Sequence, residues 1–145
     1  MKLIGMLDSP YVRRVAISLD VYGVDFVHEP LSVFRAFSEF AQINPVVKAP
    51  TLVLDDGTVL MDSSLILDYL EALAPDNKKL LAQQPAARAQ DLQVLGLALA
   101  ACEKSVQIVY EHNLRPAEKL HASWLDRISG QLLAAYSLLD QQLAD

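Results

Sequence analysis

The strongest constraint on the fold of this chain is that every strand-forming segment lies before Pro75. Short apolar or alternating runs, typical of buried strands, occur at residues 2–7, 25–30, 51–54 and 59–61. After Pro75 apolar residues recur at helical spacing and the strand signals disappear. We therefore expect an α/β part followed by an all-α part.

The first part predicts the order strand, helix, strand, helix, strand, strand, helix. A helix that begins at Pro10 and stops near Gly23 connects the strands at residues 2–7 and 25–30, so these strands should be parallel. Residues 55–57, Asp-Asp-Gly, are typical of a hairpin turn between the last two strands. The pattern predicts a mixed sheet in a βαβαββα domain of about 75 residues.

The domain organisation follows from a change of composition along the chain. We divide it into an α/β domain at residues 1–75, a polar linker at 76–84 and an all-helical region at 85–145. Two long apolar helical faces occupy the last region, separated by a break at Arg115-Pro116. Two Leu- and Ala-rich helices alone leave an apolar face uncovered. We expect this all-α region to be incomplete and the chain to be a shortened form of a longer protein; burial of the face in a dimer is the alternative.

Composition excludes several classes of function. The net charge of −6 and the absence of a basic stripe argue against nucleic-acid binding. A single cysteine, Cys102, allows no internal disulfide, and the three histidines lack metal-ligand spacing, so we expect no metal site. We find no signal peptide and no apolar run as long as a membrane-spanning helix, which predicts a cytoplasmic protein without membrane contact.

Three motifs lie on the expected elements of the first part. They are Ser-Pro-Tyr-Val-Arg at residues 9–13, Asn-Pro-Val-Val-Lys-Ala-Pro-Thr-Leu at 44–52, and Asp-Gly at 56–57 followed by Leu-Met-Asp-Ser-Ser at 60–64. Together they resemble the glutathione S-transferase family, specifically its bacterial, serine-type members. The resemblance covers the first half of the chain and implies a thioredoxin-like, glutathione-binding domain.

Ser9 is the catalytic residue that the resemblance implies. A free thiol has a pKa near 8.5, and a hydroxyl donor at a helix N-terminus favours the thiolate. Lowering that pKa by about two units needs roughly 2.7 kcal/mol, which a charged hydrogen bond and the helix end can supply together. The alternative is that Ser9 only caps the helix that begins at Pro10.

The resemblance also implies a set of glutathione-binding residues around Ser9. Pro50 would be cis, which would expose the main chain of Ala49 to the cysteinyl part of the peptide; a trans proline entering a strand is the alternative. Lys48 would contact the glycyl carboxylate or else be a solvated surface lysine. Val47 stands where the family often has glycine, so we expect the backbone of this loop to differ from the family's.

Asp62 and Ser63 lie at the start of a helix, where backbone N–H groups bind carboxylates. The resemblance implies that this pair holds the γ-glutamyl end of glutathione, with Asp62 at the ammonium and Ser63 at the carboxylate. Asp62 is shorter than the glutamate that is more usual, and the alternative is that both residues are only helix caps. We expect Arg13 to form a structural ion pair.

These residues predict a transferase that activates glutathione as co-substrate for attack on an electrophilic small molecule. The alternative is a non-catalytic relative of the same fold with an interaction or regulatory role. The resemblance further implies a homodimer. The sequence does not identify the electrophile.

Overall fold

The fold is described from a computed structural model of the chain, in which residues 1–144 are described. The chain forms two compact units, Met1–Leu80 and Leu81–Asp145. The elements of the first unit are β1 (Lys2–Ile4), α1 (Pro10–Tyr22), β2 (Val27–Glu29), α2 (Phe37–Ile43), β3 (Thr51–Val53), β4 (Val59–Met61), α3 (Ser63–Leu73) and the 3-10 helix η1 (Asp76–Lys78). Those of the second are α4 (Pro85–Leu114), the 3-10 helix η2 (Ala117–Lys119) and α5 (Ala122–Leu143).

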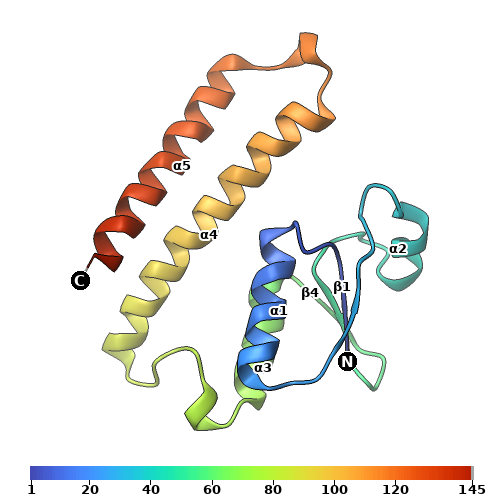
Figure 1. Cartoon of the computed structure of the whole chain (residues 1–145), viewed down its shortest axis with the longest axis vertical. Helices are drawn as coiled ribbons and strands as arrows, with labels where there is room; N and C mark the ends of the chain where they lie inside the picture. The colour runs from blue at the N-terminus through green and yellow to red at the C-terminus, as the bar shows by residue number, and fades with distance from the viewer. Residues whose placement is uncertain (145) are drawn as a thin grey trace. The chain divides into compact units, whose positions relative to one another are not determined.

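The first unit is built on a four-stranded mixed sheet in the order β2-β1-β3-β4. Leu3 of β1 pairs with His28 in parallel β2 and with Leu52 in antiparallel β3, and Leu52 in turn pairs with Leu60 of β4. Helices α1 and α3 lie together on one face of the sheet and α2 lies on the other (Figure 1). The predicted βαβαββα order and the thioredoxin-like fold are confirmed.

The core of this unit lies between the sheet and the pair α1 and α3. Its fully buried members come from each of these layers: Leu3, Val12, Val15, Leu19, Leu52, Ile66 and Leu70. Each such side chain contributes roughly 1.5–3 kcal/mol through its removal from water. This packing fixes α1 against α3, which matters because the N-termini of both helices carry predicted site residues.

Helix α1 has the ends that its sequence predicts. Ser9 is the N-cap, Pro10 occupies the first helical position, and Gly23 ends the helix in the left-handed region at φ 73°. The first strand, however, ends at Ile4 and not at Leu7. Gly5 takes φ 136°, a conformation that favours glycine, and its N–H donates to the carbonyl of Glu29 at 3.0 Å before the chain leaves the sheet.

Residues 76–80, expected in a linker, belong to the first unit. The ammonium of Lys78 donates to the carbonyl of Tyr22 at 2.9 Å, and the N–H of Leu80 donates to the buried carboxylate of Glu71 at 3.1 Å. The polar composition of this segment gives no sign of these contacts, because they depend on partners far away in the sequence.

The second unit is a pair of long helices, α4 and α5, that run alongside each other (Figure 1). By length and composition alone, α4 qualifies as a helix that could cross a membrane, so the expectation that no segment reaches this length is wrong by that measure. The adjacent Glu103 and Lys104 interrupt the apolar run in the sequence, yet they are too few to disqualify the helix. Core helices of helical domains meet the same criterion, so it is weak evidence for a membrane.

Candidate functional site

The hydroxyl of Ser9 lies at the N-terminus of α1, half-buried. Its oxygen accepts a hydrogen bond from the N–H of Val12 at 3.4 Å. A hydroxyl that accepts through oxygen keeps its hydrogen available for donation. The capping role and the thiol-binding role that the sequence presents as alternatives are therefore compatible in one side chain.

The segment that leads into Ser9 is held by Arg13. Its Nε and Nη2 both donate to the carbonyl of Leu7, at 3.0 and 2.9 Å, and the N–H of Ser9 donates to the carbonyl of Met6 at 3.1 Å. Arg13 thus forms two hydrogen bonds to one main-chain carbonyl in place of the expected ion pair. Because the guanidinium is a rigid fork, this contact fixes the loop before Ser9.

The peptide bond between Ala49 and Pro50 is cis, as predicted. Pro50 is fully buried, and Ala49 packs against the core near Val12. A Cβ placed on Gly5 would lie 3.0 Å from the Cβ of Ala49 and 2.7 Å from Cγ2 of Val12. Gly5 therefore lets the cis-proline loop approach the first turn of α1, the turn that Ser9 caps.

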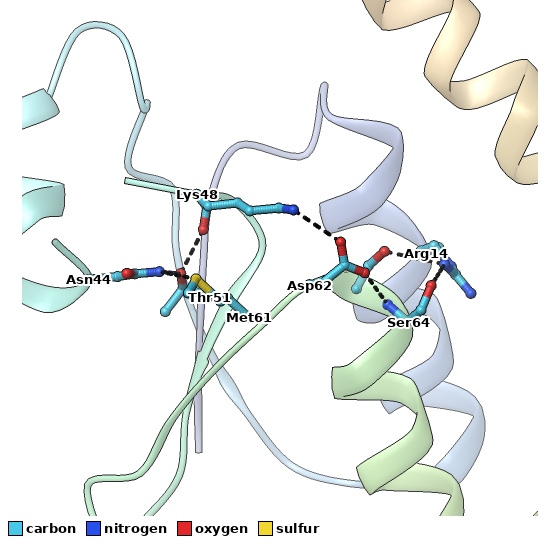
Figure 2. Close-up of polar contacts among 8 residues, drawn as sticks. Arg14, Asn44, Lys48, Thr51, Met61, Asp62 and Ser64 are labelled. Carbon is cyan, nitrogen blue, oxygen red and sulfur yellow. Dashed lines mark hydrogen bonds and ion pairs between the residues drawn. The ribbon is translucent and has the colours of Figure 1, made fainter. Parts of the chain in front are cut away.

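The loop between α2 and β3 is held by a buried polar network (Figure 2). The side-chain amide of Asn44 donates to the hydroxyl of Thr51 at 2.8 Å and to the sulfur of Met61 at 3.3 Å. The hydroxyl of Thr51 donates to the carbonyl of Lys48 at 2.7 Å. Asn44 and Thr51 are 3% and 0% exposed, and buried polar groups need such partners. Sequence reasoning placed Asn44 and Thr51 in a motif but missed that they fix the main chain at Lys48.

Val47 lies inside this loop at φ 52°. That conformation is uncommon for any residue with a Cβ and strained for a β-branched one. The backbone at position 47 thus has a conformation that favours glycine, although the residue in this chain is valine.

Asp62 caps α3 with a positive φ of 51° and a ψ of 139°. Its Oδ1 accepts from the N–H of Ser64 at 2.9 Å, and its Oδ2 lies 3.1 Å from the ammonium of Lys48. The Ser64 N–H lowers the pKa of Asp62 most; Lys48 and Arg14 also lower that pKa, against partial burial that raises it. The carboxylate is therefore ionised at neutral pH.

Arg14, which sequence reasoning missed, reaches from α1 to the start of α3. Its Nη1 donates to the hydroxyl of Ser63 at 3.2 Å and to the hydroxyl of Ser64 at 3.2 Å. Figure 2 shows Arg14 beside Ser64. Ser63 is only 2% exposed, whereas Ser64 is exposed. No spacing in the sequence brings Arg14 to Ser63; the packing of α1 on α3 does.

The structure thus brings the predicted residues into two neighbouring places. Lys48, Asp62 and Ser63 form one polar cluster with Arg14 at the N-terminus of α3. Ser9 and Ala49 flank the first turn of α1. Among residues 1–144, no group of three or more His, Cys, Asp or Glu side chains is placed to hold a metal ion.

A mixed sheet with two helices on one face, a cis-proline before β3 and a helical unit after α3 define a thioredoxin-like domain joined to a helical region. The sequence of residues 3–78, just over half the chain, matches the family described as "Glutathione S-transferase, N-terminal domain". The chain belongs to the glutathione S-transferase family.

Individual relatives agree with this assignment. An uncharacterized GST-like protein, YibF of Escherichia coli, is 37% identical over 73 residues, which are 50% of this chain and 36% of YibF. The maleylacetoacetate isomerase of Pseudomonas aeruginosa is 33% identical over 108 residues, 71% of this chain and 50% of the isomerase. The chain thus spans about half or less of these curated relatives.

A solved structure of a glutathione transferase family member from Pseudomonas fluorescens Pf-5, with bound glutathione, resembles this chain with a TM-score of 0.83 at 35% identity. The match covers 97% of this chain and 70% of that one.

Proposed function

We propose that this chain binds glutathione between the first turn of α1 and the N-terminus of α3, and that it activates the glutathione thiol for attack on an electrophilic small molecule. The observation that carries the proposal is that the loop with the cis Ala49-Pro50 peptide approaches the first turn of α1, which the Ser9 hydroxyl caps. The bound glutathione in the solved relative from Pseudomonas fluorescens supports it.

Ser9 would act on the thiol by donating its hydroxyl hydrogen to the sulfur. A charged hydrogen bond of about 1.5–3 kcal/mol, together with the unpaired N–H groups at the start of α1, stabilises the thiolate over the thiol. The thiol proton leaves to solvent, the sulfur lone pair forms the new bond to the electrophilic carbon, and the bond from that carbon to its leaving group breaks; with an aryl halide the halide ion leaves to solvent. Ser9 itself forms no covalent bond.

The remaining residues would hold the peptide in place. The main chain of Ala49 would pair with the cysteinyl residue, and Lys48 would bind the glycyl carboxylate. Asp62 would bind the γ-glutamyl ammonium. Ser63 and the N–H groups at the start of α3 would bind the γ-glutamyl carboxylate.

Two other candidate functions differ in whether they use the bound thiolate. Isomerisation through a glutathione adduct is the second candidate, which the similarity to maleylacetoacetate isomerase favours. A non-catalytic interaction role is the third, and it requires neither Ser9 nor the charged cluster. The homodimer and the cytoplasmic location stay predictions.

The test combines calorimetric titration of the full chain with glutathione and a turnover assay with an activated aryl halide. We expect binding below millimolar concentration and formation of the thioether at a rate above the uncatalysed reaction. Binding without turnover would favour the interaction role. The absence of binding at millimolar glutathione would overturn the proposal.

A further inference from the structure

Met61, the last residue of the edge strand β4, carries a sulfur that accepts a hydrogen bond from a buried side chain. The side-chain amide of Asn44 donates to this sulfur at 3.3 Å and to the hydroxyl of Thr51 at 2.8 Å (Figure 2). Thr51 is also the residue that pairs with Met61 across the two strands. Asn44 is 3% exposed, whereas Met61 is 36% exposed. A thioether of an exposed residue is therefore in direct contact with the buried polar network.

This network holds the loop between α2 and β3 on both sides of its turn. The Oδ1 atom of Asn44 accepts a hydrogen bond from the N–H of Val46 at 3.0 Å. The hydroxyl of Thr51 donates to the carbonyl of Lys48 at 2.7 Å. A change at the sulfur of Met61 therefore reaches the main chain of the cis-proline loop through a single side chain, that of Asn44.

We propose that Met61 is a site of reversible oxidation by hydroperoxides, and that its oxidation loosens this loop and weakens glutathione binding. The effect on binding rests on the proposed function, whereas the oxidation and the loosening of the loop do not depend on it.

The reaction converts the thioether of Met61 to a sulfoxide. A lone pair of the sulfur attacks the terminal oxygen of the hydroperoxide, so that an S–O bond forms and the O–O bond breaks. The proton of the transferred hydroxyl moves to the departing oxygen, which leaves as water or, from an organic hydroperoxide, as an alcohol. The sulfur is oxidised by two electrons and the peroxide is reduced by two. Methionine sulfoxide reductases reverse the change, one enzyme for each epimer at sulfur.

Met61 is the most accessible of the three methionines of the chain. Met1 and Met6 are half-buried, whereas Met61 is exposed on the edge strand. We therefore expect a hydroperoxide to convert Met61 first.

Oxidation takes away the acceptor that the amide of Asn44 uses at Met61. A thioether sulfur accepts hydrogen bonds through its lone pairs, and the reaction commits one of them to oxygen. The new oxygen cannot lie between the sulfur and Nδ2, which are 3.3 Å apart, because a hydrogen bond to that oxygen alone needs about 2.9 Å. The sulfoxide therefore displaces the amide or leaves a buried N–H without its partner. Either outcome disturbs the arrangement in which Asn44 holds the N–H of Val46.

Amide hydrogen exchange of the full chain measures the loosening of the loop. A Cys102→Ala background removes the only thiol that peroxide could oxidise instead. Once peptide masses show conversion of Met61, the N–H of Val46 should exchange about three- to tenfold faster, as expected for the loss of one hydrogen bond. The N–H of Thr58 is the internal control, because it donates to the Asp56 carboxylate in the hairpin at the other end of the two strands. Its exchange rate should not change.

Calorimetry with glutathione measures the effect on the proposed site. The dissociation constant should rise by about three- to tenfold after oxidation. It should return to its starting value once methionine sulfoxide reductases and a thiol reductant have acted and been removed.

Three variants assign the effect to one sulfur. Met61→Leu cannot form a sulfoxide at this position, so peroxide should change neither its exchange rate at Val46 nor its dissociation constant. Met6→Leu removes a half-buried methionine and should respond to peroxide as the parent protein does. Met61→Gln places a polar side chain of similar length at the position and should show the oxidised behaviour without peroxide.

Unchanged exchange at Val46 after complete conversion of Met61 would overturn the inference, and so would an equal response to peroxide in Met61→Leu. Faster exchange with an unchanged dissociation constant would overturn the effect on glutathione binding. The absence of glutathione binding before oxidation would overturn the proposed function instead, and hydrogen exchange would still decide whether oxidation of Met61 loosens the loop.

Discussion

The guanidinium of Arg14 on α1 lies 3.2 Å from the hydroxyl of Ser63, the first residue of α3. Ser9, at the start of the same α1, holds the predicted thiol site. One helix thus carries the hydroxyl proposed to bind the thiol at its N-terminus and, between one and two turns later, the side chain that contacts the proposed γ-glutamyl site. Packing between α1 and α3 therefore sets the distance between the proposed thiol site and the proposed γ-glutamyl site.

Replacing Arg14 should weaken glutathione binding more than it slows the bound reaction. Arg14→Met removes the donor that holds the hydroxyls of Ser63 and Ser64 at the proposed carboxylate site. Loss of a charged hydrogen bond predicts a rise of about tenfold or more in the KM for glutathione, with kcat within about twofold of wild type.

Steady-state kinetics with varied glutathione measure this effect. Arg14→Lys should recover only part of the affinity, because an ammonium lacks the planar fork. Arg127→Met, at an exposed arginine of α5, makes the same change of net charge and should leave KM as it is. An Arg14→Met protein with wild-type KM would show that the contact is purely structural.

Replacing Ser9 separates its two roles. Ser9→Ala loses both the cap and the hydroxyl, so stability should fall by about 1 kcal/mol and kcat by about tenfold or more. Ser9→Gly keeps a fair cap, so stability should fall by only a few tenths of a kcal/mol while kcat falls as far as in the alanine variant. Ser9→Thr should keep measurable turnover. Thermal unfolding and turnover of all three test this, and turnover of Ser9→Gly equal to wild type would remove the hydroxyl from the mechanism.

Part of the candidate site can be predicted from the sequence, because the features that predict it lie within a few residues of one another. Caps at Ser9 and Asp62 and the turn at Asp56-Gly57 are short-range features, and the structure shows each of them. The contact of Arg14 with Ser63 spans 49 positions, and that of Lys48 with Asp62 spans 14. Neither is encoded by spacing within one element, so neither can be predicted before the helices and the loop are packed.

The strained valine predicts an unusual stabilising substitution. Val47→Gly should stabilise the protein by about 0.5–1 kcal/mol, because relief of the left-handed strain, about 1–2 kcal/mol, exceeds the entropy cost of glycine. Its neighbour Val46 is exposed and does not have a positive φ, so Val46→Gly should destabilise by about 0.5–1 kcal/mol. Chemical denaturation of both variants decides the point. Equal destabilisation by the two substitutions would mean that the conformation of Val47 carries no strain.

The carboxylate of Glu71 ties residues 76–80 to the first unit. The hydroxyl of Tyr22 donates to Oε2 of Glu71 at 2.6 Å, and the N–H of Leu80 donates to the same oxygen at 3.1 Å. Tyr22→Phe removes a charged hydrogen bond from a buried carboxylate. The free energy of unfolding should therefore fall by about 1.5–3 kcal/mol at neutral pH. Tyr136→Phe, at an exposed tyrosine of α5, should change it by less than about 0.5 kcal/mol.

The same contact predicts how stability responds to alkali. Burial, and then the hydrogen bond to the Glu71 carboxylate, raise the pKa of Tyr22 well above its ordinary value of 10.0. Because the folded pKa exceeds the unfolded one, this contribution is complete below pH 10 and is lost as the pH rises above it. Denaturation between pH 8 and pH 11 should show a decline in wild type that is shallower in Tyr22→Phe. Parallel curves for the two proteins would mean that Tyr22 ionises equally in the folded and unfolded chains. That result would contradict the raised pKa of Tyr22 in the folded protein.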